Sequence, residues 1–109
     1  MIYELRTYTI VPGRMPDIER RFSQVTLRLF AKHGMQIVGF WRTVENGHPI
    51  DELVYILAHQ DQAARDASFA AFRDDPEWLA AKAESEKNGA IVAQVESKIL
   101  TPTAYSPLQ

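Results

Sequence analysis

The hydrophobic residues of this 109-residue chain repeat with two different periods, which alternate along the sequence. Segments rich in β-branched and aromatic residues, with a period near two, are typical of strands. Segments in which apolar residues recur every three or four positions are typical of helices. The pattern predicts strands at Ile2–Ile10, Met35–Glu45, Glu52–Gln60 and Ala90–Leu100, and helices at Pro16–His33, Gln62–Arg73 and Glu77–Lys87.

Capping and turn residues support these boundaries. Gly34 suits the left-handed position that ends the first helix, and Asp61 is a favourable N-cap for the second. Asp75 is followed by a proline, which predicts a new helix start and divides the second helical region in two. Asn46-Gly47 indicates a turn at the start of a longer loop between the second and third strands.

Together these elements predict an α+β fold of the ferredoxin-like βαββαβ type, with a four-stranded antiparallel sheet in the order 4-1-3-2. We expect one domain over residues 1–109, in which 101–109 form an extended tail. The third strand is apolar on both faces, so we expect it inside the sheet. One register of the first and last strands places Arg6 opposite Glu96 and Glu4 opposite Lys98, as two cross-strand charge pairs.

In this fold the helices cover only one face of the sheet. The strands carry apolar residues on the other face as well, and exposed apolar patches of this kind usually mark interfaces. We therefore predict a homodimer in which two sheets face each other and close into a barrel. The alternative is a monomer whose open face is polar enough to be solvated.

Composition excludes several classes of function. The net charge is −2 and no Lys/Arg run is longer than Arg20-Arg21, which argues against nucleic-acid binding. No apolar run reaches the length of a membrane span. The chain has no cysteine, which excludes disulfides, thiolate metal sites and cysteine nucleophiles. The sequence begins directly in a strand, so we expect no signal peptide and a cytoplasmic location.

Six short motifs, in order along the whole chain, resemble the NIPSNAP family. They are Ile2–Tyr8, Pro12-Gly13, Lys32–Gly34, Val38–Trp41, Asp75–Trp78 and Thr101–Leu108. The resemblance implies the dimeric α+β-barrel fold, which NIPSNAP proteins share with cofactor-free monooxygenases, muconolactone isomerases and several haem enzymes. It implies no particular reaction, because the family offers no catalytic motif to transfer. Ala104-Tyr105 depart from the proline and phenylalanine that relatives often have.

The three histidines offer little support for a metal or cofactor site. His33 extends the apolar stripe of the first helix, and we interpret it as a histidine stabilised at the helix end. The alternatives are a pocket acid or base, or an axial ligand as in the haem enzymes of this fold. His59 closes the third strand and is expected at the surface, with a role in a pocket as the alternative. His48 lies in a turn. No two histidines have metal-ligand spacing, so we predict no metal and no cofactor.

Aromatic and polar residues on the predicted strands and the first helix are candidates for a small, mainly apolar pocket between sheet and helices. The candidates are Arg6, Tyr8, His33, Trp41 and Tyr55. Two functions fit such a pocket: a binding or interaction protein for a small apolar or aromatic ligand, and a cofactor-independent enzyme of the monooxygenase or isomerase type. Aromatic residues at such positions also commonly serve only as core.

Overall fold

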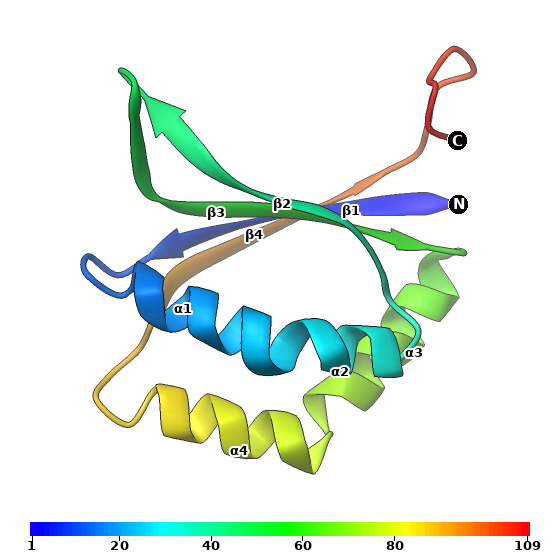
Figure 1. The fold of residues 1–109 in the computed structure, drawn as a ribbon. Coiled ribbons are helices and arrows are strands. Elements are labelled where there is room, and N and C mark those ends of the chain that lie inside the picture. The colour runs from blue at the N-terminus through cyan, green and yellow to red at the C-terminus, as the bar shows by residue number, and fades with distance from the viewer.

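The computed structural model describes residues 1–109 as one antiparallel sheet with helices on a single face (Figure 1). The strands are β1 (Ile2–Ile10), β2 (Gln36–Glu45), β3 (His48–His59) and β4 (Val92–Leu100), in the order β2-β3-β1-β4. The helical layer consists of α1 (Met15–Arg21), the π-helical turn η1 (Phe22–Thr26), α2 (Leu27–Lys32), α3 (Gln62–Arg73) and α4 (Pro76–Ser85). The predicted ferredoxin-like fold is confirmed. None of the helices is both long and apolar enough to cross a bilayer.

The capping residues act as their sequence positions predict. The Asp61 carboxylate accepts a hydrogen bond from the Ala64 N–H at 2.8 Å and begins α3. Asp75 accepts from the Glu77 N–H at 2.9 Å and begins α4. α4 is the one helix of this layer that contributes no fully buried residue.

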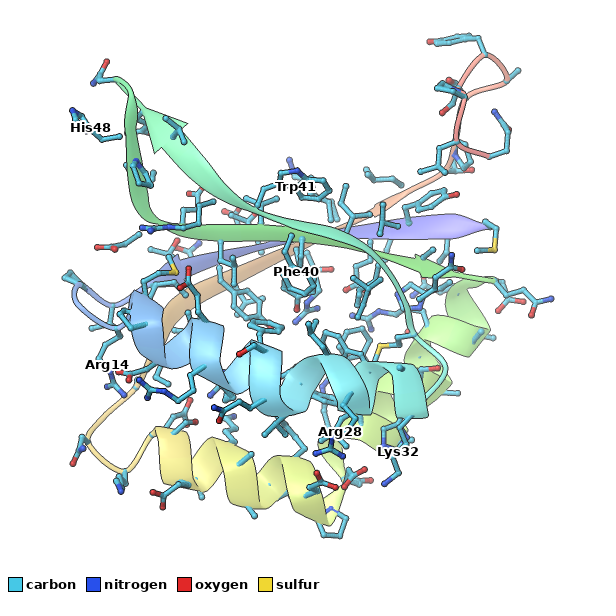
Figure 2. The ribbon with its side chains drawn as sticks, viewed as in Figure 1. Arg14, Arg28, Lys32, Phe40, Trp41 and His48 are labelled. Atoms are coloured by element: carbon cyan, nitrogen blue, oxygen red, sulfur yellow. The ribbon has the colours of Figure 1, made fainter.

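The β2–β3 hairpin is tighter than predicted. Asn46 and Gly47 have φ values of 51° and 79°, and Glu45 already pairs with His48. Two central residues with positive φ make a turn whose twist matches that of the strands, so pairing resumes at once. The longer loop expected before Glu52 is therefore wrong, and His48 lies at the far tip of the sheet (Figure 2).

The first helical region contains a π turn that the hydrophobic spacing did not reveal. The Leu27 N–H bonds to the Phe22 carbonyl, five residues earlier, and the Thr26 hydroxyl donates to the Arg21 carbonyl at 3.2 Å. Such turns widen the helix locally and are frequent at functional sites. Arg21, Phe22 and Thr26 are all buried on the side that faces the sheet and α4.

The expected charge pairs between β1 and β4 are wrong by one residue. Arg6 lies opposite Ser97, and Glu4 lies opposite Ile99. Because side chains alternate between the faces of a sheet, a shift of one residue places Glu96 on the face opposite to Arg6. Glu4 instead finds its cationic partners in Arg6 of its own strand and in α3.

The two faces of the sheet differ in character. Phe40 points towards the helices, whereas Trp41 lies on the open face (Figure 2). The indole of Trp41 lies over Gly39, where a Cβ atom would come within 2.7 Å of the ring. On β1 and β3 the open face carries the apolar residues Leu5, Val54 and Ile56, and exposed Val38 lies at the bulge of β2. On β4 the open face is polar, with Gln94, Glu96 and Lys98.

Candidate functional site

A cavity of about 180 Å³ lies between the sheet and the helical layer. Residues of β1, α1, η1, α2, α3 and α4 line it, so every helix contributes to its wall. Five of its residues are aromatic and apolar: Phe22, Phe30, Phe69, Phe72 and Trp78. Their rings lie close together, with centroids 4.9 Å apart for Phe30 and Phe72 and 4.6 Å apart for Phe72 and Trp78.

The rest of the wall is polar, and it is cationic. Tyr8 and Thr26 contribute hydroxyl groups, and the charged residues are Arg6, Arg21, Arg73 and Lys82. No carboxylate lines the cavity. Arg73 and Lys82 are exposed to solvent, so the cavity reaches the surface between α3 and α4. The pocket is therefore aromatic, as its sequence candidates suggested, but much more basic than the mainly apolar pocket that we expected.

A buried carboxylate organises the polar groups behind this wall. Both oxygens of Glu4, which is fully buried, accept hydrogen bonds from Arg65 of α3, at 3.0 and 2.8 Å. Arg6 donates to Glu4 at 2.9 Å and Ser97 of β4 donates at 2.6 Å. A buried charge is tolerated when it is paired and hydrogen-bonded in this way.

These contacts determine the protonation states in the cluster. Burial acts to raise the pKa of Glu4, but hydrogen bonds from Arg65, Ser97 and Arg6 outweigh it and lower that pKa from 4.5 to about 2. Burial lowers the pKa of His59 below its ordinary 6.5, so this imidazole is neutral at pH 7. Because ionised Glu4 can only accept, the His59 Nε2–H donates to it across 3.1 Å. The expectation that His59 lies at the surface is wrong, since the residue is buried.

A chain of hydrogen bonds leads from this cluster into the cavity. The Arg6 Nε–H donates to the Tyr55 oxygen at 2.7 Å, and the Tyr55 and Tyr8 oxygens are 2.8 Å apart. Burial raises the pKa of Tyr55 well above its ordinary 10, so this phenol keeps its proton. Tyr8 provides the one acceptor in reach of that proton, so Tyr55 donates to Tyr8. The hydroxyl hydrogen of Tyr8 is then left for an acceptor in the cavity.

The structure brings together three of the five pocket candidates. Arg6 and Tyr8 line the cavity, and Tyr55 lies directly behind them. His33 does not line it: its Nε2 lies 2.8 Å from Asp75 Oδ2, at the junction of α2 and α4. Trp41 lies on the open face of the sheet (Figure 2).

Several residues of the site escaped the sequence analysis. Arg65, Arg73 and Lys82 lie on α3 and α4. Their place at the site depends on how these helices pack on the rest of the protein, which the sequence pattern does not reveal. Arg21 did carry a signal, because it follows Ile18 by three positions and so falls on the apolar side of its helix. An arginine at such a position indicates a buried cation, which requires a partner.

Comparison with known proteins relates the chain to one family. The NIPSNAP family model matches residues 3–107. A NIPSNAP family protein of unknown function from Agrobacterium tumefaciens has a similar structure, with 29% identity, a TM-score of 0.84, and coverage of 100% of this chain and 94% of that one. An uncharacterised NIPSNAP-like domain protein from Burkholderia xenovorans has 21% identity and a TM-score of 0.82, over 97% and 88% of the two chains.

A more distant structural neighbour has a described activity. SnoaB, a cofactor-independent oxygenase from Streptomyces nogalater, has 18% identity and a TM-score of 0.61, over 97% of this chain and 96% of that one. At this identity the likeness concerns the fold alone. No curated protein matches the chain.

Replacing Glu4 tests the role of the buried cluster. In Glu4→Gln the guanidinium groups of Arg6 and Arg65 lose their counter-charge, so we expect the free energy of unfolding at pH 7 to fall by about 3 kcal/mol or more. Urea denaturation measures this change. Glu96→Gln, on the exposed face of β4, is the matched control and should change stability little.

The pH dependence of stability provides a second readout of the same variant. Because folding lowers the pKa of Glu4 from 4.5 to about 2, its contribution is complete above pH 4.5 and is lost as the pH falls towards 2. The wild-type protein should therefore lose more stability over this range than Glu4→Gln. Parallel pH profiles for the two proteins would contradict the assignment.

Proposed function

This chain belongs to the NIPSNAP family, and because membership implies no particular reaction, we propose its function from the cavity: the protein binds a small, single-ring aromatic molecule. The observation that carries the proposal is the combination of aromatic walls with a directed hydrogen-bond donor, the Tyr8 hydroxyl. The ligand's ring packs among the phenylalanines and Trp78, and its polar substituent accepts the Tyr8 hydrogen bond.

The size of the cavity supports a ligand of this kind. Its volume of about 180 Å³ exceeds the roughly 150 Å³ that is enough for an apolar protein cavity to hold benzene. One ring with one small substituent fits a volume of this size. Aromatic rings that meet edge-to-face or offset add specific attraction beyond the area they bury.

Ligand binding can be followed through a single tryptophan. The chain has two tryptophans, and Trp41→Phe leaves Trp78 in the cavity wall as the only one. We expect a saturable change in Trp78 fluorescence with at least one of three probes: benzamide, benzyl alcohol and benzoate. Tyr8→Phe removes one hydrogen bond, so the affinity of that probe should fall about three- to tenfold.

The matched control is Tyr3→Phe. Tyr3 lies on the same strand, but its hydroxyl donates to the Gln109 main-chain oxygen on the open face. This variant should bind the probe as the parent protein does. Failure of all three probes to bind, or an affinity that Tyr8→Phe does not change, would refute the proposed site.

A second candidate function is a cofactor-independent enzyme. It is favoured by the hydrogen-bond chain from Arg6 through Tyr55 to Tyr8, because such a chain can deliver a proton to a bound substrate or stabilise a negative oxygen. The likeness to SnoaB shows that this fold accommodates a cofactor-independent oxygenase. In this reading the cavity holds a phenolic substrate beside Tyr8.

Oxygen consumption distinguishes the enzyme from the binding protein. If the chain is oxygenase-like, purified protein without added metal or cofactor should consume oxygen with a simple phenol. Tyr55→Phe interrupts the chain behind Tyr8 and should abolish this consumption, whereas Tyr3→Phe should preserve it. Without oxygen consumption, the oxygenase-like form of this candidate is rejected and the binding function stands.

We further propose that the protein acts as a homodimer that buries the open face of the sheet. The support is the apolar surface over β2 and β3, where Val38 and Trp41 are exposed next to half-buried Val54 and Ile56. Covering such a surface removes apolar area from water, which favours association. Because the open face of β4 carries polar side chains, we expect the centre of the contact nearer to the β2–β3 side.

Light scattering tests the dimer. We expect a mass of about twice 12.4 kDa for the wild-type chain, and a monomer for Trp41→Glu, since the new charge has no partner in the interface. The matched control is Leu79→Glu, on α4, because Leu79 is 54% exposed and Trp41 is 51% exposed. A wild-type mass near 12.4 kDa would contradict the proposed assembly.

A further inference from the structure

We propose that the ligand of the cavity is an aromatic acid, and that its carboxylate is anchored by Arg21. The inference rests on the proposed binding function and specifies the class of ligand. It comes from the state of the Arg21 side chain, which is incompletely partnered in a buried place, and from the balance of charge around the cavity.

Arg21 is held deep in the helical layer. Its side chain is only 6% exposed and lines the cavity. One terminal nitrogen, Nη1, donates to Ser85 Oγ at 3.2 Å and lies 3.5 Å from Glu86 Oε1. The guanidinium carbon lies 5.0 Å from the centre of the Trp78 ring.

The Nε–H group of Arg21 has no partner. Among the buried side-chain nitrogen and oxygen atoms of the protein it is the one without a hydrogen bond. The Trp78 ring attracts the cation but offers no lone pair to an N–H donor. An unsatisfied buried donor is unfavourable, more so on a charged group. Since Arg21 lines the cavity, an acceptor bound beside its guanidinium would relieve this cost.

The charge of the surroundings selects a negative acceptor. Arg6 shares its partner Glu4 with Arg65, and Arg65 also pairs with Asp66. Arg73 and Lys82, at the cavity mouth, form no ion pair, and Glu86 does not line the cavity. A neutral ligand leaves this excess of positive charge unbalanced, whereas a carboxylate compensates it with charge-assisted hydrogen bonds.

The local helix geometry keeps Arg21 in this position. Arg21 immediately precedes the π turn, and its carbonyl accepts the hydrogen bond from Thr26. The turn presents Arg21, Phe22 and Thr26 together to the cavity, although Phe22 is one position and Thr26 five positions after Arg21. A ligand carboxylate bound to Arg21 would therefore lie beside the aromatic wall that holds the ligand's ring.

The test compares two ligands of nearly identical shape, benzoate and benzamide, on the full chain at low ionic strength. If the site recognises an acid, benzoate should bind about tenfold more tightly or better. In Arg21→Gln this preference should fall to about twofold or less, because Gln keeps a donor but lacks the charge. Arg20→Gln, one residue earlier and exposed, is the matched control and should keep the preference.

A second measurement does not depend on the folding of an Arg21 variant. In the wild-type protein, the ¹⁵Nε–¹Hε NMR signal of Arg21 should shift on addition of benzoate and remain in place with benzamide. Lys82→Gln, at the exposed mouth, should reduce the preference for benzoate and its dependence on salt.

The outcomes separate this inference from the function on which it rests. Equal affinities for benzoate and benzamide overturn the acid assignment and leave the aromatic-binding function intact. A benzoate preference that survives in Arg21→Gln, or an Arg21 Nε signal that does not respond, overturns the role of Arg21. Failure of both probes to bind, with benzyl alcohol also inactive, overturns the binding function itself.

Discussion

The pairing of one buried carboxylate, Glu4, with two guanidinium groups is the interaction on which the site depends. Glu4 lies in the first strand, where only the alternation of side chains places it on the helix side. A charge there must be paired, and Arg6 and Arg65 pair with it from the sheet and from α3. The pairing holds α3 against the sheet and orients Arg6, which in turn orients the hydroxyl groups of Tyr55 and Tyr8.

The two arginines of the cavity wall differ in how completely they are satisfied. Arg6 is ion-paired with Glu4 and its Nε–H is hydrogen-bonded to Tyr55, so it acts on the cavity through the tyrosines. Arg21 keeps one buried donor free. Protein interiors rarely leave such a group unpaired, which is why a partner from outside the chain is the physical explanation that we favour.

The sequence predicted the fold and the strand part of the site. Arg6, Tyr8 and Tyr55 lie on the helix side of neighbouring strands, so parity and strand order bring them together. Simple alternation from Ile37, which faces the helices, would turn Trp41 towards them as well. A bulge between Ile37 and Gly39 changes which residues of β2 face the helices, so Trp41 lies on the open face. Contacts such as Glu4–Arg65 could not be predicted, since they depend on how a helix is placed over the sheet.

The absence of fully buried residues in α4 has a consequence for the rates at which a ligand would enter and leave the cavity. This helix carries Trp78 and Lys82 of the cavity wall, yet it contributes no fully buried residue. Segments with few buried residues open most readily, so we expect α4 to be the wall element that moves first. Under the proposed function, ligand exchange would depend on movements of α4 and affinity on Arg21 and the tyrosines, so residence time and selectivity could evolve separately.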